Sequence, residues 1–195
     1  LATLRNIAVV TFPIGIGLAT VAPDAVMALY GPNWDGAVIV LQLISLLLLA
    51  NCLKVVGPAY LLAAGDVRAN VYISLIYTVV LVPALAFGVN YGPAGAAGTW
   101  LALGAPLSIG VIIWCGRKVN VSVMDLCRTV AGPGLRVAVM GAVVLGVGWA
   151  LPPFGAEAPV FWAWIRLLAQ VAVGALIYAG WTLQAEPEVQ DYVRK

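Results

Sequence analysis

Six long apolar stretches, separated by short connectors rich in Gly, Pro and polar residues, constrain the fold of this chain more than any other feature. They cover approximately residues 7–30, 37–64, 69–89, 94–115, 135–151 and 160–183. A bilayer core about 30 Å thick needs roughly 20 apolar helical residues to cross it. Charged residues make up only 9% of the chain, against about 25% in soluble domains. The sequence therefore predicts an all-α polytopic membrane protein with six transmembrane helices.

The basic residues fall on one side of the membrane if these six spans alternate in direction. Cytoplasmic loops carry an excess of Lys and Arg, and the opposite loops here hold Asp24, Asp35 and Glu157 but no basic residue. We expect a multi-pass protein of the bacterial cytoplasmic (inner) membrane, with both ends of the chain and a tail at 186–195 in the cytoplasm. The residues on the basic side are Arg5, Arg68, Arg117, Lys118, Arg128, Arg136, Arg194 and Lys195.

The residue types exclude most enzyme chemistry from this segment. The sequence has no His, and Cys52, Cys115 and Cys127 show no metal-ligand spacing. Every Asp and Glu lies in a connector, near a span end or in the tail, so a buried proton relay is not expected. No Gly-rich phosphate loop follows a predicted strand. We expect no enzyme, no cofactor, no metal site and no nucleic-acid partner.

Small residues at a four-residue spacing predict the faces on which helices pack in lipid. The fourth span carries Ala94, Gly98 and Ala102. The longest such stripe lies on the fifth span and predicts its contact face; its members are Gly134, Ala138, Ala142, Gly146 and Ala150.

Lys54 stands in the middle of the most apolar run of the sequence. It lies 17 residues after Ala37, about 25 Å along a helix, so its stem could snorkel to the cytoplasmic boundary. Alternatively it lines a wet cavity together with Asn51, which is three residues earlier and about 60° around the helix. A charge held at mid-membrane costs about 2.5–3.5 kcal/mol on insertion scales, so its presence there would indicate a function.

Arg166 and Gln170 form a second polar pair, one turn apart in the last span. Arg166 is about 10 Å from Pro159 and follows the aromatic residues Phe161, Trp162 and Trp164, which resemble an interfacial belt. Snorkelling is the favoured interpretation of Arg166. Both residues nevertheless stay candidates for a substrate pathway, with Lys54 and Asn51.

The order of several short motifs resembles one family of exporters. These motifs are Tyr30-Gly31 with Trp34 and Ala37, the helix end Leu61-Leu62-Ala63-Ala64-Gly65, and Gly92 with Gly95-Ala96-Ala97. In these features the chain resembles the C-terminal lobe of the polysaccharide and lipid-linked oligosaccharide flippases (Wzx-type, polysaccharide transporter family). That family belongs to the multidrug/oligosaccharidyl-lipid/polysaccharide (MOP) exporter superfamily.

The resemblance implies part of one lobe of a MOP-type (MATE- and lipid-flippase-like) helical bundle. Its partners would be an N-terminal lobe of the same protein, membrane lipids and an undecaprenyl-diphosphate-linked sugar. Alternating access would move that substrate to the outer leaflet, with Lys54, and Arg166 as a second cation, facing the diphosphate. Since the sequence begins at Leu1 and has no signal-peptide features, we expect a piece of a longer chain.

Three other functions stay open at this point. A small-molecule exporter of the same fold would be expected to place ionisable carboxylates inside the bundle. In a non-transporting membrane subunit, Lys54 would only snorkel and the small-residue stripes would bind a partner helix. An integral glycosyl or acyl transferase is disfavoured by the missing His and by the lack of a large polar loop.

Overall fold

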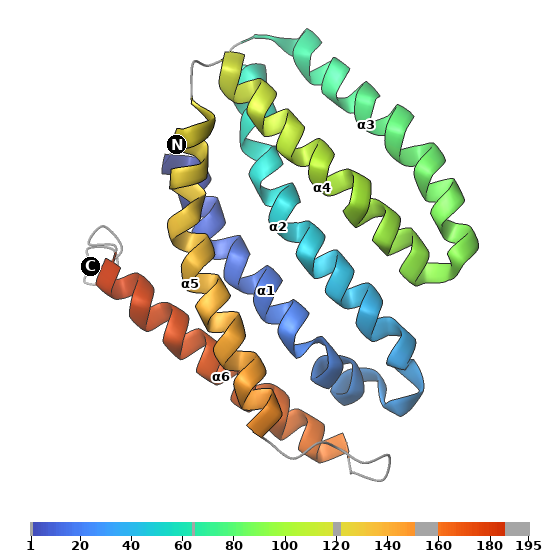
Figure 1. Cartoon of the computed structure of the whole chain (residues 1–195), viewed down its shortest axis with the longest axis vertical. Helices are drawn as coiled ribbons and strands as arrows, with labels where there is room; N and C mark the ends of the chain where they lie inside the picture. The colour runs from blue at the N-terminus through green and yellow to red at the C-terminus, as the bar shows by residue number, and fades with distance from the viewer. Residues whose placement is uncertain (1, 64, 119–121, 151–159, 186–195) are drawn as a thin grey trace.

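The computed structural model describes residues 2–63, 65–118, 122–150 and 160–185, and within them the chain is helical. Each long helix runs opposite to the one before it, so the helices form an up-and-down bundle (Figure 1). No strand occurs in the described residues, and the all-α prediction is confirmed. In chain order the elements are α1 (Ala2–Tyr30), η1 (Pro32–Trp34), α2 (Asp35–Ala63), α3 (Val67–Gly88), η2 (Val89–Tyr91), α4 (Gly92–Lys118), α5 (Val123–Ala150) and α6 (Val160–Ala185).

Five stretches of the described chain are long and apolar enough to cross a membrane. One of them, Val67–Lys118, is 52 residues long and takes in α3, η2 and α4. The polytopic prediction is therefore confirmed. The predicted number of six transmembrane helices depends on dividing this stretch at η2, where the chain reverses direction (Figure 1).

Helix α5 begins at Val123, well before the apolar stretch predicted from residue 135. The Ser122 hydroxyl accepts a hydrogen bond from the Met124 amide at 3.2 Å, and Asp125 lies in the first turn. A hydroxyl cap and an acidic first turn both favour a helix start. Hydropathy detects only the lipid-embedded part of a helix, so it misses a polar extension of this kind.

Two turns joining the long helices use the same backbone geometry. Gly31 has φ 81° and ψ −174°, and Gly92 has φ 79° and ψ −173°. Positive φ is strained for residues with a Cβ atom, so glycine is required at both positions. The repeated Tyr-Gly-Pro sequence at these turns therefore reflects one local conformation.

The core lies where α1 packs against α2, α5 and α6, whereas α3 lies on the outer side of α4. Phe12 of α1 and Val137, Met140 and Val144 of α5 belong to its main apolar cluster. The predicted small-residue face of α5 is wrong, because most of its members are exposed in the described bundle. The face of α5 that packs against α1 lies beside the small-residue stripe. A Cβ atom on Gly141, which is on this packing face, would come within 2.7 Å of Ile16 Cγ2 of α1.

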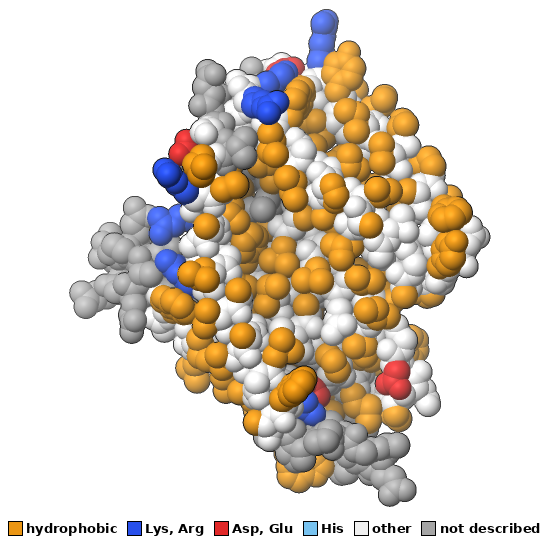
Figure 2. Space-filling model, viewed as in Figure 1, with side chains coloured by type: hydrophobic (Ala, Val, Ile, Leu, Met, Phe, Trp, Pro, Cys, Tyr) orange, Lys and Arg blue, Asp and Glu red, His pale blue; other side chains and the backbone are white. Residues whose placement is uncertain are grey.

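Most of the described Lys and Arg side chains are concentrated at one end of the bundle. Figure 2 shows hydrophobic side chains over most of the visible face, with Lys and Arg gathered along its upper and left edge. That edge carries the start of α5 and the end of α4, as the topology in Figure 1 shows. The alternating helices thus bring the described basic residues of α1, α3, α4 and α5 to a common end.

Candidate functional site

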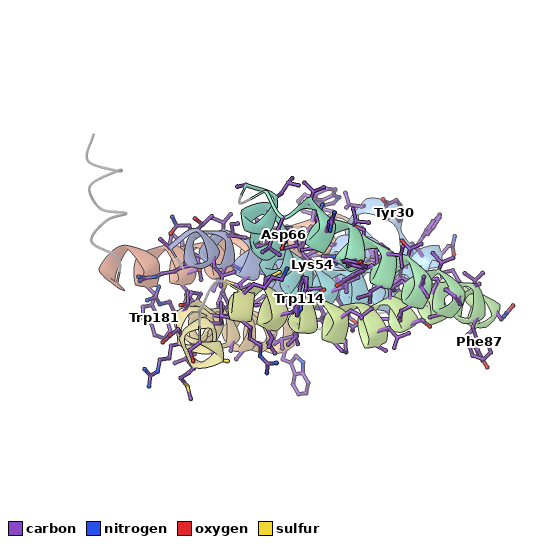
Figure 3. The ribbon with its side chains drawn as sticks, turned by 90° about the horizontal axis from the view of Figure 1, so that it is seen from above. Tyr30, Lys54, Asp66, Phe87, Trp114 and Trp181 are labelled. Atoms are coloured by element: carbon purple, nitrogen blue, oxygen red, sulfur yellow. The ribbon has the colours of Figure 1, made fainter. Side chains whose placement is uncertain are left out.

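Lys54 extends sideways from α2 toward α3. Its Nζ atom lies 4.0 Å from the centroid of the Tyr77 ring, a cation–π contact. Lys54 is nine residues from the end of α2 and Tyr77 ten residues from the start of α3, about 13–15 Å in each case. The Lys54 ammonium therefore lies at about the same level along the bundle as the Lys54 backbone, and does not extend toward the end of α2. Figure 3 shows Lys54 in the region of Asp66 and Trp114, far from Phe87 at the other end of α3.

A chain of hydrogen bonds extends from this contact to Asn51. The Tyr77 hydroxyl lies 2.7 Å from Ser108 Oγ, and Ser108 is fully buried. The Ser108 hydroxyl in turn reaches the Gly104 carbonyl at 2.7 Å and Asn51 Oδ1 at 3.3 Å. Because a serine has one hydroxyl proton, it donates to one of these acceptors at a time.

These four residues, Asn51, Lys54, Tyr77 and Ser108, form what we call the polar junction of α2, α3 and α4. The shared polar face predicted for Asn51 and Lys54 fits this arrangement. Tyr77 contacts the Lys54 ammonium, Ser108 reaches Asn51, and the hydroxyls of Tyr77 and Ser108 lie within hydrogen-bond distance of each other. Sequence reasoning missed Tyr77 and Ser108. The signal was weak, because each is a single hydroxyl-bearing residue in an otherwise apolar helix.

The chemistry of the polar junction is that of a binding surface. It offers one ammonium, one amide and two hydroxyls, groups that interact with anions and with sugar hydroxyls. Among the described residues, no group of three or more His, Cys, Asp or Glu could hold a metal ion.

Arg166 occupies a different environment from the predicted interfacial one. Its Nε atom lies 3.3 Å from Asp24 Oδ2 of α1, and its guanidinium donates a hydrogen bond to the Gly148 carbonyl of α5. The Asp24 and Arg166 side chains are 9% and 18% exposed. The sequence pattern predicts Asp24 among the charges of the outer loops, but the structure places it within α1 as a buried residue. As the ion-pair partner of Arg166, Asp24 holds the guanidinium inside the bundle.

Gln170 is buried one turn after Arg166, against Gly148. A Cβ atom on Gly148 would lie 2.7 Å from Gln170 Nε2, so the end of the Gln170 side chain would have to shift to admit a larger residue there. Arg166 and Gln170 together therefore connect α6 to α5 and, through Asp24, to α1.

The four predicted pathway residues do not form one site. Lys54 and Asn51 belong to the polar junction, whereas Arg166 and Gln170 belong to the contact of α1, α5 and α6. Helices α2 and α6 do not touch each other in the described parts of the chain. If a substrate pathway exists, the polar junction is its better candidate, because the Arg166 pair already fastens helices together.

An ion pair joins the α2–α3 turn to the end of α4. Lys118 Nζ lies 2.5 Å from Asp66 Oδ2 and 4.8 Å from the centroid of the Trp114 ring. Asp66 also caps α3 by accepting a hydrogen bond from the Ala69 amide. The Lys118 contact first, and the Ala69 amide second, lower the pKa of the Asp66 carboxyl below its ordinary value near 3.8.

This pKa shift predicts a pH-dependent stability difference between the protein and its Asp66→Asn variant. A carboxyl whose folded pKa is depressed stabilises the fold above its ordinary pKa, and this stabilisation is lost as pH falls through the folded pKa. Thermal unfolding in detergent should therefore give a lower midpoint for Asp66→Asn at neutral pH, with a gap that closes below about pH 3.8. Asp125→Asn is the matched control. A gap that stays constant down to acid pH would contradict the role of Lys118.

Comparison with known proteins finds one informative relative. The chain is 28% identical over 194 residues to the teichuronic acid biosynthesis protein TuaB of Bacillus subtilis (strain 168). The alignment covers 96% of this chain and 38% of TuaB, so the chain spans well under half the length of this relative. No family model and no solved structure matches the chain.

Proposed function

We propose that the chain is part of a membrane exporter that flips a lipid-linked oligosaccharide or polysaccharide precursor across the cytoplasmic membrane. The similarity to a teichuronic acid biosynthesis protein supports a role in polysaccharide biosynthesis. The single observation that carries the proposal is the position of Lys54, whose ammonium stays well inside α2 beside Tyr77. An intramembrane cation at this depth marks a substrate or ion pathway more often than a structural contact.

In this proposal the polar junction binds the head group of the substrate. The undecaprenyl diphosphate carrier is anionic, and an ammonium in a low-dielectric site attracts a diphosphate strongly. Lys54 would face the phosphates, and the Tyr77 and Asn51 side chains would offer hydrogen bonds to phosphate or sugar oxygens. The prenyl tail would stay in lipid, so only the polar part of the substrate would need the interior path.

Alternating access supplies the movement. Transporters of this type rock one bundle against another around a site near the middle of the membrane. The described helices would form part of one bundle, and the N-terminal lobe of the same protein would form the other. The bundle would move as a unit, because the Arg166–Asp24 ion pair and the apolar core join α1, α5 and α6.

Complementation tests this proposal. The full-length protein that contains this chain is expressed in a bacterial strain from which its own polysaccharide exporter gene has been deleted, and surface polysaccharide is measured. Restored surface polysaccharide is the expected result. Lipid-linked precursor that keeps accumulating inside the cell, despite normal amounts of the protein in the membrane, would contradict the proposal.

The small-molecule exporter is the second candidate, and one structural observation favours it. Asp24 is a carboxylate buried in α1, the kind of group that such an exporter needs inside its bundle. We place this candidate second because Asp24 is engaged by Arg166. Resistance to toxic cations, measured in the same complementation strain, separates the two candidates.

A further inference from the structure

An elongated apolar hollow lies between α1 and α6, and α5 completes its wall. Its volume is about 490 Å³. It follows α1 from Pro13 to Val21 and α6 from Gln170 to Ala179, about 12–14 Å along each helix. Small-molecule sites in proteins are hollows of about 300–1,000 Å³, mainly apolar, with a few polar groups that fix the orientation of the ligand. The hollow therefore has the size and the lining of a ligand site.

A glutamine at one end of the hollow carries an acceptor that the described residues do not satisfy. Gln170 lines the hollow, and the residue is only 3% exposed. In the described part of the chain, no group donates a hydrogen bond to its buried Oε1 atom. A buried acceptor without a donor destabilises the folded protein, so such a group indicates a missing partner. The last torsion of a glutamine side chain is broad, so the oxygen can turn toward a ligand in the hollow.

The hydroxyl toward the other end of the hollow already has a partner. The Tyr178 hydroxyl donates a hydrogen bond to the Val9 carbonyl at 2.7 Å. Pro13 has no amide proton, so the Val9 carbonyl, four residues earlier, lacks its helical donor, and the tyrosine replaces that donor. The hollow thus presents one unsatisfied polar group at the Gln170 end and an apolar surface along the rest of its length.

The depth and the neighbours of Gln170 disfavour a charged ligand. Gln170 is ten residues from the start of α6, about 15 Å, near the middle of a bilayer core about 30 Å thick. A charge at that depth is costly. The Arg166 guanidinium, one turn away, would repel an ammonium, and an anion would compete with Asp24, which already pairs with Arg166. A hydroxyl meets these conditions, because it is uncharged and donates one hydrogen bond.

We propose that this hollow binds a neutral long-chain alcohol, whose hydroxyl donates to Gln170 Oε1 and whose apolar chain extends toward Tyr178. Such a ligand reaches the hollow from the bilayer, since Ile14 and Val171 line the hollow and are 56% and 50% exposed. The inference does not depend on the proposed export function, because neither the polar junction nor Lys54 takes part in it.

Binding of dodecanol and of dodecane to the full-length protein in nanodiscs tests the inference. The two radiolabelled ligands differ only in the hydroxyl, and empty nanodiscs correct for ligand dissolved in lipid. We expect dodecanol to bind about fivefold more tightly than dodecane, the effect of one ordinary hydrogen bond. Gln170→Leu removes the acceptor and should bring the two affinities together without weakening dodecane. Gln170→Met, a second apolar replacement, should behave in the same way.

A variant that fills the hollow tests its location. Ala175 is an exposed residue of the lining, and Ala175→Leu should weaken both ligands at least as much as the loss of the hydroxyl does. Ala172→Leu adds the same volume at an exposed position of α6 outside the lining, and should leave both affinities unchanged.

Four results would overturn the inference. The first is equal binding of the two ligands to the wild-type protein, and the second is a preference for dodecanol that survives in Gln170→Leu and Gln170→Met. The third is unchanged binding in Ala175→Leu. The fourth is binding of neither ligand, because another part of the full-length protein would then cover the hollow.

Discussion

Replacing Lys54 by Ala should reduce export of the lipid-linked saccharide about 10- to 100-fold while leaving the protein in the membrane. Hydrogen bonds to charged groups contribute about 1.5–3 kcal/mol, and that loss corresponds to this range of rates. The reason is specific to the position, because Lys54 supplies the ammonium of the polar junction. Surface polysaccharide in the complementation strain, normalised to the amount of membrane protein, measures the effect.

Two companion variants sharpen this prediction. Val55→Ala changes the next residue, which is exposed and apolar, and should leave export unchanged. Lys54→Arg keeps the charge but replaces a compact ammonium by a planar guanidinium, so we expect partial activity. Normal surface polysaccharide from Lys54→Ala at normal protein level would remove Lys54 from the mechanism.

Replacing Asp24 by Asn should destabilise the bundle by about 3–5 kcal/mol, the usual effect of removing one partner of a buried ion pair. Asp24 is buried, and its removal takes from the Arg166 guanidinium a carboxylate at 3.3 Å. The lost contact lies where α1, α5 and α6 meet, because Arg166 of α6 also donates a hydrogen bond to the Gly148 carbonyl of α5. The unfolding midpoint in detergent, and the amount of protein recovered from membranes, measure it.

The matched control for this prediction is Asp35→Asn, which removes a carboxylate from an exposed position at the start of α2. It should change the midpoint little. The double variant Asp24→Asn, Arg166→Gln should recover part of the stability, because it leaves no buried charge without its partner. Equal stability of Asp24→Asn and Asp35→Asn would show that the ion pair does not hold the helices together.

The fold was largely predictable because lipid leaves few choices. A backbone in hydrocarbon must satisfy its own hydrogen bonds, so long apolar stretches become helices, and the connectors at Gly31 and Gly92 mark the turns. Helix ends outside the apolar layer were less predictable. The start of α5 at Val123 depends on the Ser122 cap, a signal that hydropathy does not contain.

The candidate site was only half predictable, for a different reason. The spacing of Asn51 and Lys54 placed them on one face of a single helix. Their partners Tyr77 and Ser108 come from other helices, and pairing between helices leaves no periodic mark in the sequence. The packing face of α5 was missed for the same reason. Its choice depends on Phe12 and Ile16 of α1, not on the spacing of small residues within α5.

The central claim, that Lys54 faces a wet interior path, is tested most directly by chemical access to position 54. In the full-length protein with Cys52, Cys115 and Cys127 replaced, single cysteines are placed at 54 and at the neighbouring exposed position 55, and each is treated with a charged thiol reagent. The account predicts fast labelling of Lys54→Cys, slowed by added lipid-linked substrate, and slow labelling of Val55→Cys, whose side chain lies on an exposed apolar part of α2. Labelling of position 54 that is no faster than that of position 55 would contradict it.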